Sequence, residues 1–169
     1  MSSKEKEFYN ACEKNKLEKV KELSNQIDDI NWGNGNEFEY TGLHTSCSWG
    51  KKEIVEYLIS LPKINVNKEN KDGKTPLWMA CREGNEEIVK ILFASGREID
   101  TTKKTILGND YWNNKTAAEI ARRQGKEQIA KLVDEYAKNP MEIILRLRKE
   151  MSKIFCELFK CIQQNHLQN

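Results

Sequence analysis

The chain has 169 residues, and its 28 basic and 26 acidic side chains leave a formal net charge of +2. This length suits one ordinary domain that folds without metals or disulfides. So small a net charge argues against nucleic-acid binding. Apolar runs stay well short of the about 18 residues that cross a membrane. Residues 1–7 are polar, so we expect neither a secretory signal nor a myristoyl anchor.

The cysteine pattern indicates a reducing compartment. The number of cysteines is odd, and no two have Cys-x-x-Cys spacing. They are Cys12, Cys47, Cys81, Cys156 and Cys161. We therefore predict free thiols and a cytoplasmic protein, with the nucleus left open.

A threonine motif recurs along the chain. Thr41 opens Thr-Gly-Leu-His, Thr75 opens Thr-Pro-Leu-Trp and Thr116 opens Thr-Ala-Ala-Glu. A small residue, a glycine and an apolar helical pattern follow each of them. With an N-terminal unit added, the small residues are spaced by 35, 34 and 41 positions: Ala11, Ser46, Ala80 and Ala121. This period predicts a solenoid of stacked helix pairs.

The third unit shows the local chemistry of each helix pair. Thr75 can cap the first helix, and Pro76 suits its first position, where the missing N–H costs nothing. Gly84 can adopt the left-handed conformation that ends this helix. In the first unit Asn15 takes that place, and Asn is the next-best left-handed residue.

Residues 72–92 read Asp-Gly-Lys-Thr-Pro-Leu-Trp-Met-Ala-Cys-Arg-Glu-Gly-Asn-Glu-Glu-Ile-Val-Lys-Ile-Leu. This run resembles the ankyrin repeat and departs clearly only at Trp78, where that family prefers His. The resemblance covers roughly residues 4–137. It implies an all-α ankyrin-repeat solenoid of helix-turn-helix units with β-turn fingers. We expect an ankyrin repeat domain at 1–138, with repeats at about 4–30, 36–68, 70–100 and 111–138, the first a polar cap.

The segment before the fourth unit is about seven residues longer than in the other units. Residues 101–106 have β-propensity, and Gly108-Asn109 is a turn signal. We predict an extended hairpin finger at about 101–110 that widens the partner-binding face. A surface loop without such structure is the alternative.

The C-terminal segment, residues 139–169, carries a heptad-like apolar stripe. Its members include Ile144, Leu147, Met151, Ile154, Leu158 and Cys161. We predict one amphipathic helix of about 25 residues that caps the open end of the stack. A homodimer seam or a docking helix is the alternative, so the chain is expected to be a monomer or a homodimer. Acidic residues offset the basic ones here, which disfavours membrane binding.

The sequence offers no recognisable catalytic, metal or cofactor motif. The two histidines are His44, in the threonine motif, and His166. The resemblance implies a structural hydrogen-bonding role for His44. Three cysteines share one position of successive units and are predicted to be small buried side chains: Cys12, Cys47 and Cys81. We predict a protein that is not an enzyme and needs no cofactor.

The resemblance also implies where a partner protein binds. Ankyrin repeats usually bind partners on the concave side, made of the turn tips and the exposed faces of the first helices. The predicted contact residues are Phe38, Tyr40, Trp49, Lys71, Lys74, Arg82, Glu83, Trp112 and Arg123. Aromatic side chains and Arg are enriched at binding hot spots. An aromatic stripe flanked by basic residues would suit a peptide with apolar anchors and some acidic character.

We therefore predict a non-catalytic protein–protein interaction module acting as an adaptor, scaffold or inhibitor, with no nucleic-acid or membrane partner. Two alternatives stay open. The first is a self-associating structural protein that uses the C-terminal helix as its seam. The second is a regulatory subunit of an enzyme. At the level of contacts, the aromatic rings could instead pack on their own repeats.

Overall fold

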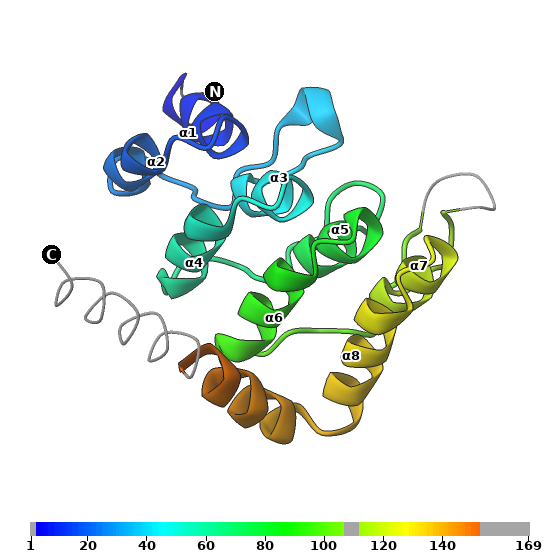
Figure 1. Ribbon diagram of the computed structural model, residues 1–169. Coiled ribbons are helices and arrows are strands. Elements are labelled where there is room, and N and C mark those ends of the chain that lie inside the picture. The colour runs from blue at the N-terminus through cyan, green and yellow to red at the C-terminus, as the bar shows by residue number, and fades with distance from the viewer. Residues whose placement is uncertain (1–2, 107–111, 153–169) are drawn as a thin grey trace, which may run out of the picture.

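Four helix pairs follow one another along the chain (Figure 1). The computed structural model describes residues 3–106 and 112–152. The pairs are α1 (Ser3–Glu13) with α2 (Leu17–Ser24), α3 (Gly42–Ser48) with α4 (Lys52–Ser60), α5 (Pro76–Glu83) with α6 (Glu86–Ala94), and α7 (Ala117–Arg123) with α8 (Glu127–Lys138). A short 3-10 helix, η1 (Gly35–Glu37), precedes α3. Residues 140–152 form the described part of a further helix.

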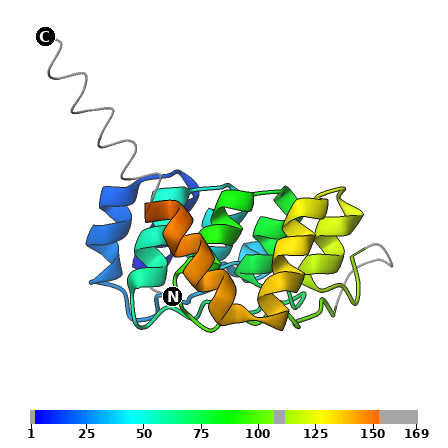
Figure 2. The ribbon, with the colours of Figure 1, turned by 60° about the horizontal axis from the view of Figure 1, so that its bottom comes forward.

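The helix pairs stack into two layers. The first helices of the pairs contact one another in order, and so do the second helices (Figure 1, Figure 2). Apolar side chains from both layers, such as Leu43, Leu58 and Val89, form one continuous buried core. The described residues contain no β-strand, and the turn before α3 holds one isolated bridge between Asn34 and Tyr40. The predicted all-α solenoid is confirmed.

Threonine caps begin three of the first helices, as predicted for Thr75. The side chain of Thr75 accepts a hydrogen bond from the Trp78 N–H at 3.2 Å. Thr41 and Thr116 do the same for the third residue of their helices, and both form a reciprocal capping box. Each cap satisfies a backbone donor that would otherwise lack a partner at the helix start.

The break between the helices of each pair has left-handed backbone at one residue. The φ angle is 56° at Asn15, 63° at Gly50, 83° at Gly84 and 70° at Gly125. The prediction that Asn15 adopts the left-handed conformation in place of a glycine is therefore confirmed. All four units reverse the chain by the same device.

Hydrogen bonds from buried side chains join successive repeats. His44 donates its Nε2–H to the Lys74 carbonyl at 2.9 Å, while its Nδ1 accepts the Thr41 N–H at 3.2 Å. Burial lowers the pKa of His44 to about 4, so its ring is neutral at pH 7. Trp78, at the equivalent position one repeat later, donates its indole N–H to the Lys115 carbonyl at 3.2 Å. Trp78 therefore replaces the expected His in both burial and bonding.

The three cysteines of the described residues are buried free thiols. Burial raises the pKa of Cys12 to about 12 and raises those of Cys47 and Cys81 further. A thiol that stays protonated is a poor nucleophile, so the predicted packing role fits their setting. Cys156 and Cys161 lie outside the described residues.

The insertion before α7 is closed at its base by backbone hydrogen bonds. The Thr105 N–H donates to Lys115 O at 3.2 Å, and the Asn114 N–H donates to Thr105 O at 2.9 Å. Residues 101–106 nevertheless form no strand, contrary to their β-propensity, and Ile106 donates its N–H to Asp72 O of the neighbouring turn at 2.9 Å. The tip of the predicted finger, 107–111, lies outside the described residues.

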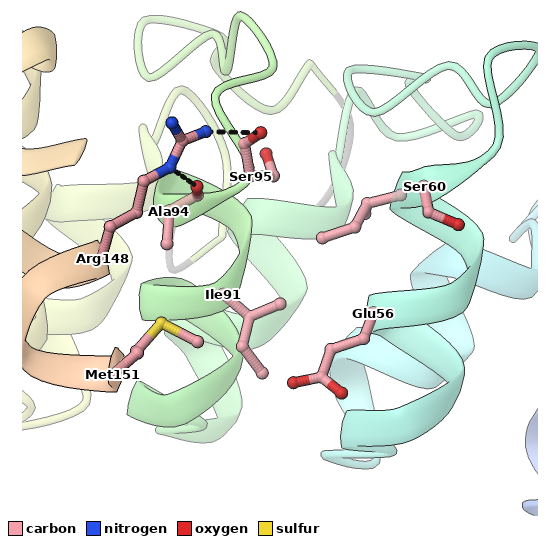
Figure 3. A pocket seen from close by; sticks show the side chains of 8 residues that line it. Glu56, Ser60, Ile91, Ala94, Ser95, Arg148 and Met151 are labelled. Carbon is pink, nitrogen blue, oxygen red and sulfur yellow. Dashed lines mark hydrogen bonds between the residues drawn. The ribbon is translucent and has the colours of Figure 1, made fainter. Parts of the chain in front are cut away.

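The helix at 140–152 runs back across the second-helix layer (Figure 2). Its apolar side chains Ile143 and Leu147 are buried. The guanidinium of Arg148 donates to Ala94 O at 2.7 Å and to Ser95 O at 3.1 Å, at the end of α6 (Figure 3). Arg97 makes the equivalent bond at the end of α4, where its guanidinium donates to Ile59 O at 3.2 Å. The helix at 140–152 thus supplies an arginine donor to the last carbonyls of α6, as the loop after α6 does for α4.

A single non-helical residue, Asn139, separates α8 from the helix at 140–152. Arg148 of this helix contacts the end of α6, and the cap over the open end of the stack stays a prediction. A hollow of about 360 Å³ lies between this helix, α6 and α4, with Met151 at its edge (Figure 3). Met141 and Leu145 point away from the stack and are 63% and 61% exposed. Positions beyond residue 152, including Ile154 and Leu158 of the stripe, lie outside the described residues.

Candidate functional site

A cleft of about 200 Å³ opens where α1, the turn around η1, α3 and α5 meet. The first-helix layer forms its floor, and the turn forms one wall. The residues that line it are Tyr9, Glu13, Glu37, Tyr40, His44, Thr45, Ser48, Trp49, Met79 and Arg82. Three of these are contact residues predicted from the sequence: Tyr40, Trp49 and Arg82. The structure brings them together.

Tyr9 joins α1 to the turn. Its side chain is 2% exposed, and its hydroxyl donates a short hydrogen bond to the carboxylate of Glu37. Burial, followed by the hydrogen bond to Glu37, raises the pKa of Tyr9 well above its usual value, so the phenol is neutral. The ring also meets Trp32 edge to face, with centroids 6.5 Å apart. This contact fixes Glu37 at the rim of the cleft.

The turn holds two residues that are not glycine in left-handed backbone. The φ angle is 54° at Phe38 and 62° at Glu39, a conformation that costs about 1 kcal/mol or more for each such residue. The Asn34 N–H donates to Tyr40 O at 2.9 Å and closes the turn. Phe38 is 59% exposed as a result, so it does not pack on its own turn. Strained, exposed residues of this kind cluster at functional surfaces.

Trp49 stands at the other side of the cleft, immediately after α3. It is 64% exposed, although tryptophan is normally a buried residue. Tyr40 is half-buried and tilts against the ring of His44, with centroids 5.7 Å apart. The predicted aromatic stripe is therefore partly realised: Trp49 and Phe38 are open, and Tyr40 packs against its own repeat.

The basic residues predicted to flank the stripe carry little free charge. Lys71, Lys74 and Arg82 each pair with a carboxylate of this chain. The pairs are Lys71–Glu39 at 3.3 Å, Lys74–Asp72 at 2.7 Å, and Arg82–Glu83. Arg123 lies exposed at the end of α7. Because Lys71, Lys74 and Arg82 are already paired within the chain, they give no support to a preference for an acidic partner.

A second cluster lies between α5 and α7. The guanidinium of Arg82 sits 5.6 Å from the Trp112 ring centroid and 5.9 Å from that of Trp78. The two indoles meet edge to face at 6.1 Å. Lys74 Nζ approaches the Trp78 ring at 5.4 Å. The structure thus brings together three predicted contact residues, Lys74, Arg82 and Trp112, around Trp78, which is 1% exposed.

Tyr9 and Glu13 are functional candidates that the sequence reasoning missed. The sequence predicts a polar cap for the first unit and no contact residue within it. The repeat spacing of 35 residues nevertheless places Tyr9 in register with His44 and Glu13 in register with Ser48. The signal is present in the register, since Arg82, one repeat further along from Ser48, is itself a predicted contact residue.

Two further observations bound the chemistry of the described chain. Within residues 3–106 and 112–152, no group of His, Cys, Asp and Glu side chains is arranged to hold a metal ion. No described helix is long and apolar enough to cross a membrane.

Comparison with known proteins identifies the family. A family model of three ankyrin repeats matches residues 8–105, more than half of the chain. The chain belongs to the ankyrin repeat family. Its fourth helix pair, α7 with α8, follows the matched region and repeats the threonine cap and the left-handed glycine. Ankyrin repeats are generally protein–protein interaction modules without catalytic activity of their own.

Several curated proteins share this repeat region. The ankyrin repeat protein YahD of Escherichia coli is 35% identical over 101 residues, 57% of this chain and 46% of YahD. Rabankyrin-5 of Mus musculus is 28% identical over 112 residues, 63% of this chain and 9% of its own length. The Homo sapiens transient receptor potential cation channel subfamily A member 1 is 30% identical over 121 residues, 69% of this chain and 11% of the channel. The chain thus spans less than half of each of these relatives.

Proposed function

We propose that this ankyrin repeat chain binds a segment of a partner protein along its first-helix face, centred on the cleft between Tyr9 and Trp49. The observation that carries the proposal is the exposure of Trp49, 64%, at the edge of that cleft. Phe38, 59% exposed on the strained turn between the lining residues Glu37 and Tyr40, is a second exposed aromatic side chain. Large aromatic side chains presented in this way are typical anchors of binding energy.

The scaffold beneath these side chains is preformed. Buried hydrogen bonds from His44 and Trp78 tie each repeat to the next, and Tyr9 ties α1 to the turn. A surface that is already ordered loses little conformational entropy on binding. Such a module would act as an adaptor, a scaffold or an inhibitor, depending on the partner.

Peptide selection tests this proposal directly. The immobilised full chain would be used to select binders from a random 12-residue peptide library, and affinities would be measured by calorimetry. We expect Trp49→Ala combined with Arg82→Ala to abolish measurable binding while circular dichroism still shows the folded chain. Met141→Ala, which removes an equally exposed apolar side chain from residues 140–152, is the matched control. Peptides that bind the double variant as tightly as the parent chain would refute the proposed face.

Self-association is a second candidate function, favoured by one observation. Met141 and Leu145 are both exposed, four residues apart on the same side of their helix. Light scattering during size-exclusion chromatography of the full chain would reveal a dimer. We would then expect Met141→Ser with Leu145→Ser to return the mass to that of a monomer; a mass that stays constant over a hundredfold dilution series and is unaffected by the variant would exclude this candidate.

We also propose a reducing compartment, the cytoplasm or the nucleus. Three buried free thiols in the core support it: Cys12, Cys47 and Cys81. Fluorescent tagging of the full chain at either end would test the location.

A further inference from the structure

We infer that the cleft between α1, the turn and α3 binds a cationic side chain, Lys or Arg, of the partner segment. This inference rests on the proposed function and gives it a chemical specificity. The features that point to it are two carboxylates at the rim, aromatic walls and the absence of a free positive charge among the lining residues.

The carboxylates come from two different elements. Glu13 ends α1, and Glu37 ends η1. Tyr9 donates its hydroxyl to one oxygen of Glu37, Oε2, and leaves Oε1 to accept a second donor. No ion pair within the described residues neutralises Glu13 or Glu37. Two negative charges therefore face one small cleft.

The remaining lining residues do not offset this charge. Arg82 is the cationic side chain that lines the cleft, and its guanidinium is paired with Glu83 and held against the Trp112 ring. His44 is buried and neutral, since burial lowers its pKa to about 4. Tyr9 is a neutral phenol. The local field of the cleft thus favours a positive group.

The aromatic and apolar side chains that line the cleft add shape and contact surface to this negative field. The exposed ring of Trp49 and the half-buried ring of Tyr40 border the cleft, and Met79 forms part of its apolar lining. Ring faces attract ammonium and guanidinium groups, and apolar walls accept the methylene stem of Lys or Arg. A volume of about 200 Å³ accommodates the end of one such side chain and little more. An acidic or purely apolar side chain would leave Glu13 and Glu37 desolvated without a partner.

A small defined probe tests the inference without a known partner. The full chain, labelled with nitrogen-15, would be titrated with N-acetyl-lysinamide and separately with N-acetyl-norleucinamide, which has the same stem without the charge. The Trp49 indole resonance, assigned through Trp49→Phe, reports binding. We expect a saturable shift with the lysine probe and at least fivefold weaker binding of the norleucine probe.

Charge-neutral variants supply the decisive comparison. Glu13→Gln with Glu37→Gln keeps the acceptor for Tyr9 and should weaken the lysine probe by about fivefold to tenfold at low salt. Glu53→Gln with Glu127→Gln makes the same change of net charge at exposed sites on α4 and α8, and should have no effect. Equal binding of both probes, or equal effects of the two double variants, would overturn the inference.

Failure of the inference can be told apart from failure of the proposed function. Library peptides that lose binding with Trp49→Ala and are enriched in Lys or Arg support both. Peptides that need Trp49 and lack any basic preference would leave the binding face standing and reject the cationic specificity. Peptides indifferent to both Trp49 and the two glutamates would reject the face itself.

Discussion

The two halves of the first-helix face use the same positions for opposite chemistry. In the N-terminal half, Tyr9 and Glu13 line an open cleft together with Glu37, whose carboxylate accepts the Tyr9 hydroxyl. In the C-terminal half, the equivalent residues are Trp78 and Arg82, and they form a closed cluster of indoles and paired charge with Trp112. The repeat fixes where each side chain stands. The chemical type of that side chain decides whether the position lines an open cleft or belongs to a closed, packed cluster.

The C-terminal half should respond most strongly to mutation, because its aromatic side chain is buried. Trp78→Ala should lower the free energy of unfolding by about 3–5 kcal/mol, since it leaves a large cavity and removes the bond to Lys115 O. Urea unfolding followed by circular dichroism measures this loss. Trp49→Ala, a change of equal size at an exposed site, should cost less than about 0.5 kcal/mol. An equal loss of unfolding free energy in the two variants would contradict the distinction between the closed cluster and the open cleft.

The His44 ring should make the stack sensitive to acid. Its folded pKa of about 4 lies below the unfolded value of about 6.5, so the unfolded chain takes up the proton first. Stability should therefore fall as the pH drops from 6.5 toward 4, by about 2.5 kcal/mol at pH 4.5 relative to pH 7. Urea unfolding of the parent chain and of His44→Gln at both pH values isolates this effect. An acid sensitivity that is undiminished in His44→Gln would show that other groups cause it.

The N-terminal half should matter for binding rather than for stability. Trp49→Ala alone should weaken a selected library peptide by about thirtyfold, the size of a hot-spot contribution of about 2 kcal/mol. Calorimetry gives the affinity, and Trp112→Ala serves as the comparison from the other half. A larger loss of affinity with Trp112→Ala, at unchanged stability, would move the centre of the binding surface toward α7.

A substitution in the strained turn should have the smallest effect on stability, and it should stabilise the fold rather than destabilise it. Glu39→Gly should stabilise the fold by up to about 1 kcal/mol, because the φ of 62° suits glycine better than glutamate. The loss of the Glu39–Lys71 pair subtracts little from an exposed site. Thermal unfolding measures the gain. A destabilised Glu39→Gly variant would mean that the side chain supports the turn in a way that outweighs its backbone cost.

The sequence predicted the fold well because the ankyrin pattern is local and repeated. Thr75, Pro76 and Gly84 carry their own conformational reasons, and the structure places each as expected. The structural role of His44 was also predictable. Trp78 was harder to interpret, since only the structure shows its N–H taking over the bond of the missing histidine.

The site was predictable only in part, for two physical reasons. Contact positions such as Trp49 follow from the repeat register, whereas ion pairs such as Lys74–Asp72 depend on side-chain conformations that the register does not define. Tyr9 and Glu13 lie outside the predicted contact residues, because a polar cap predicts an end of the stack rather than a repeat with its own contact positions. The reversal of the tail at Asn139 could not be read from its heptads, which define an apolar face but not what that face covers.

The most direct test of the binding face is a map of where a bound peptide perturbs the chain. A library-selected peptide would be titrated into the full chain labelled with nitrogen-15, and amide and indole shifts would be recorded residue by residue. The structure predicts shifts concentrated at Tyr9, Glu37 and Trp49, with little change along α4, α6 and residues 140–152. Shifts centred on Arg148 and Met151 at the hollow of the second-helix layer, with Trp49 unmoved, would contradict the account.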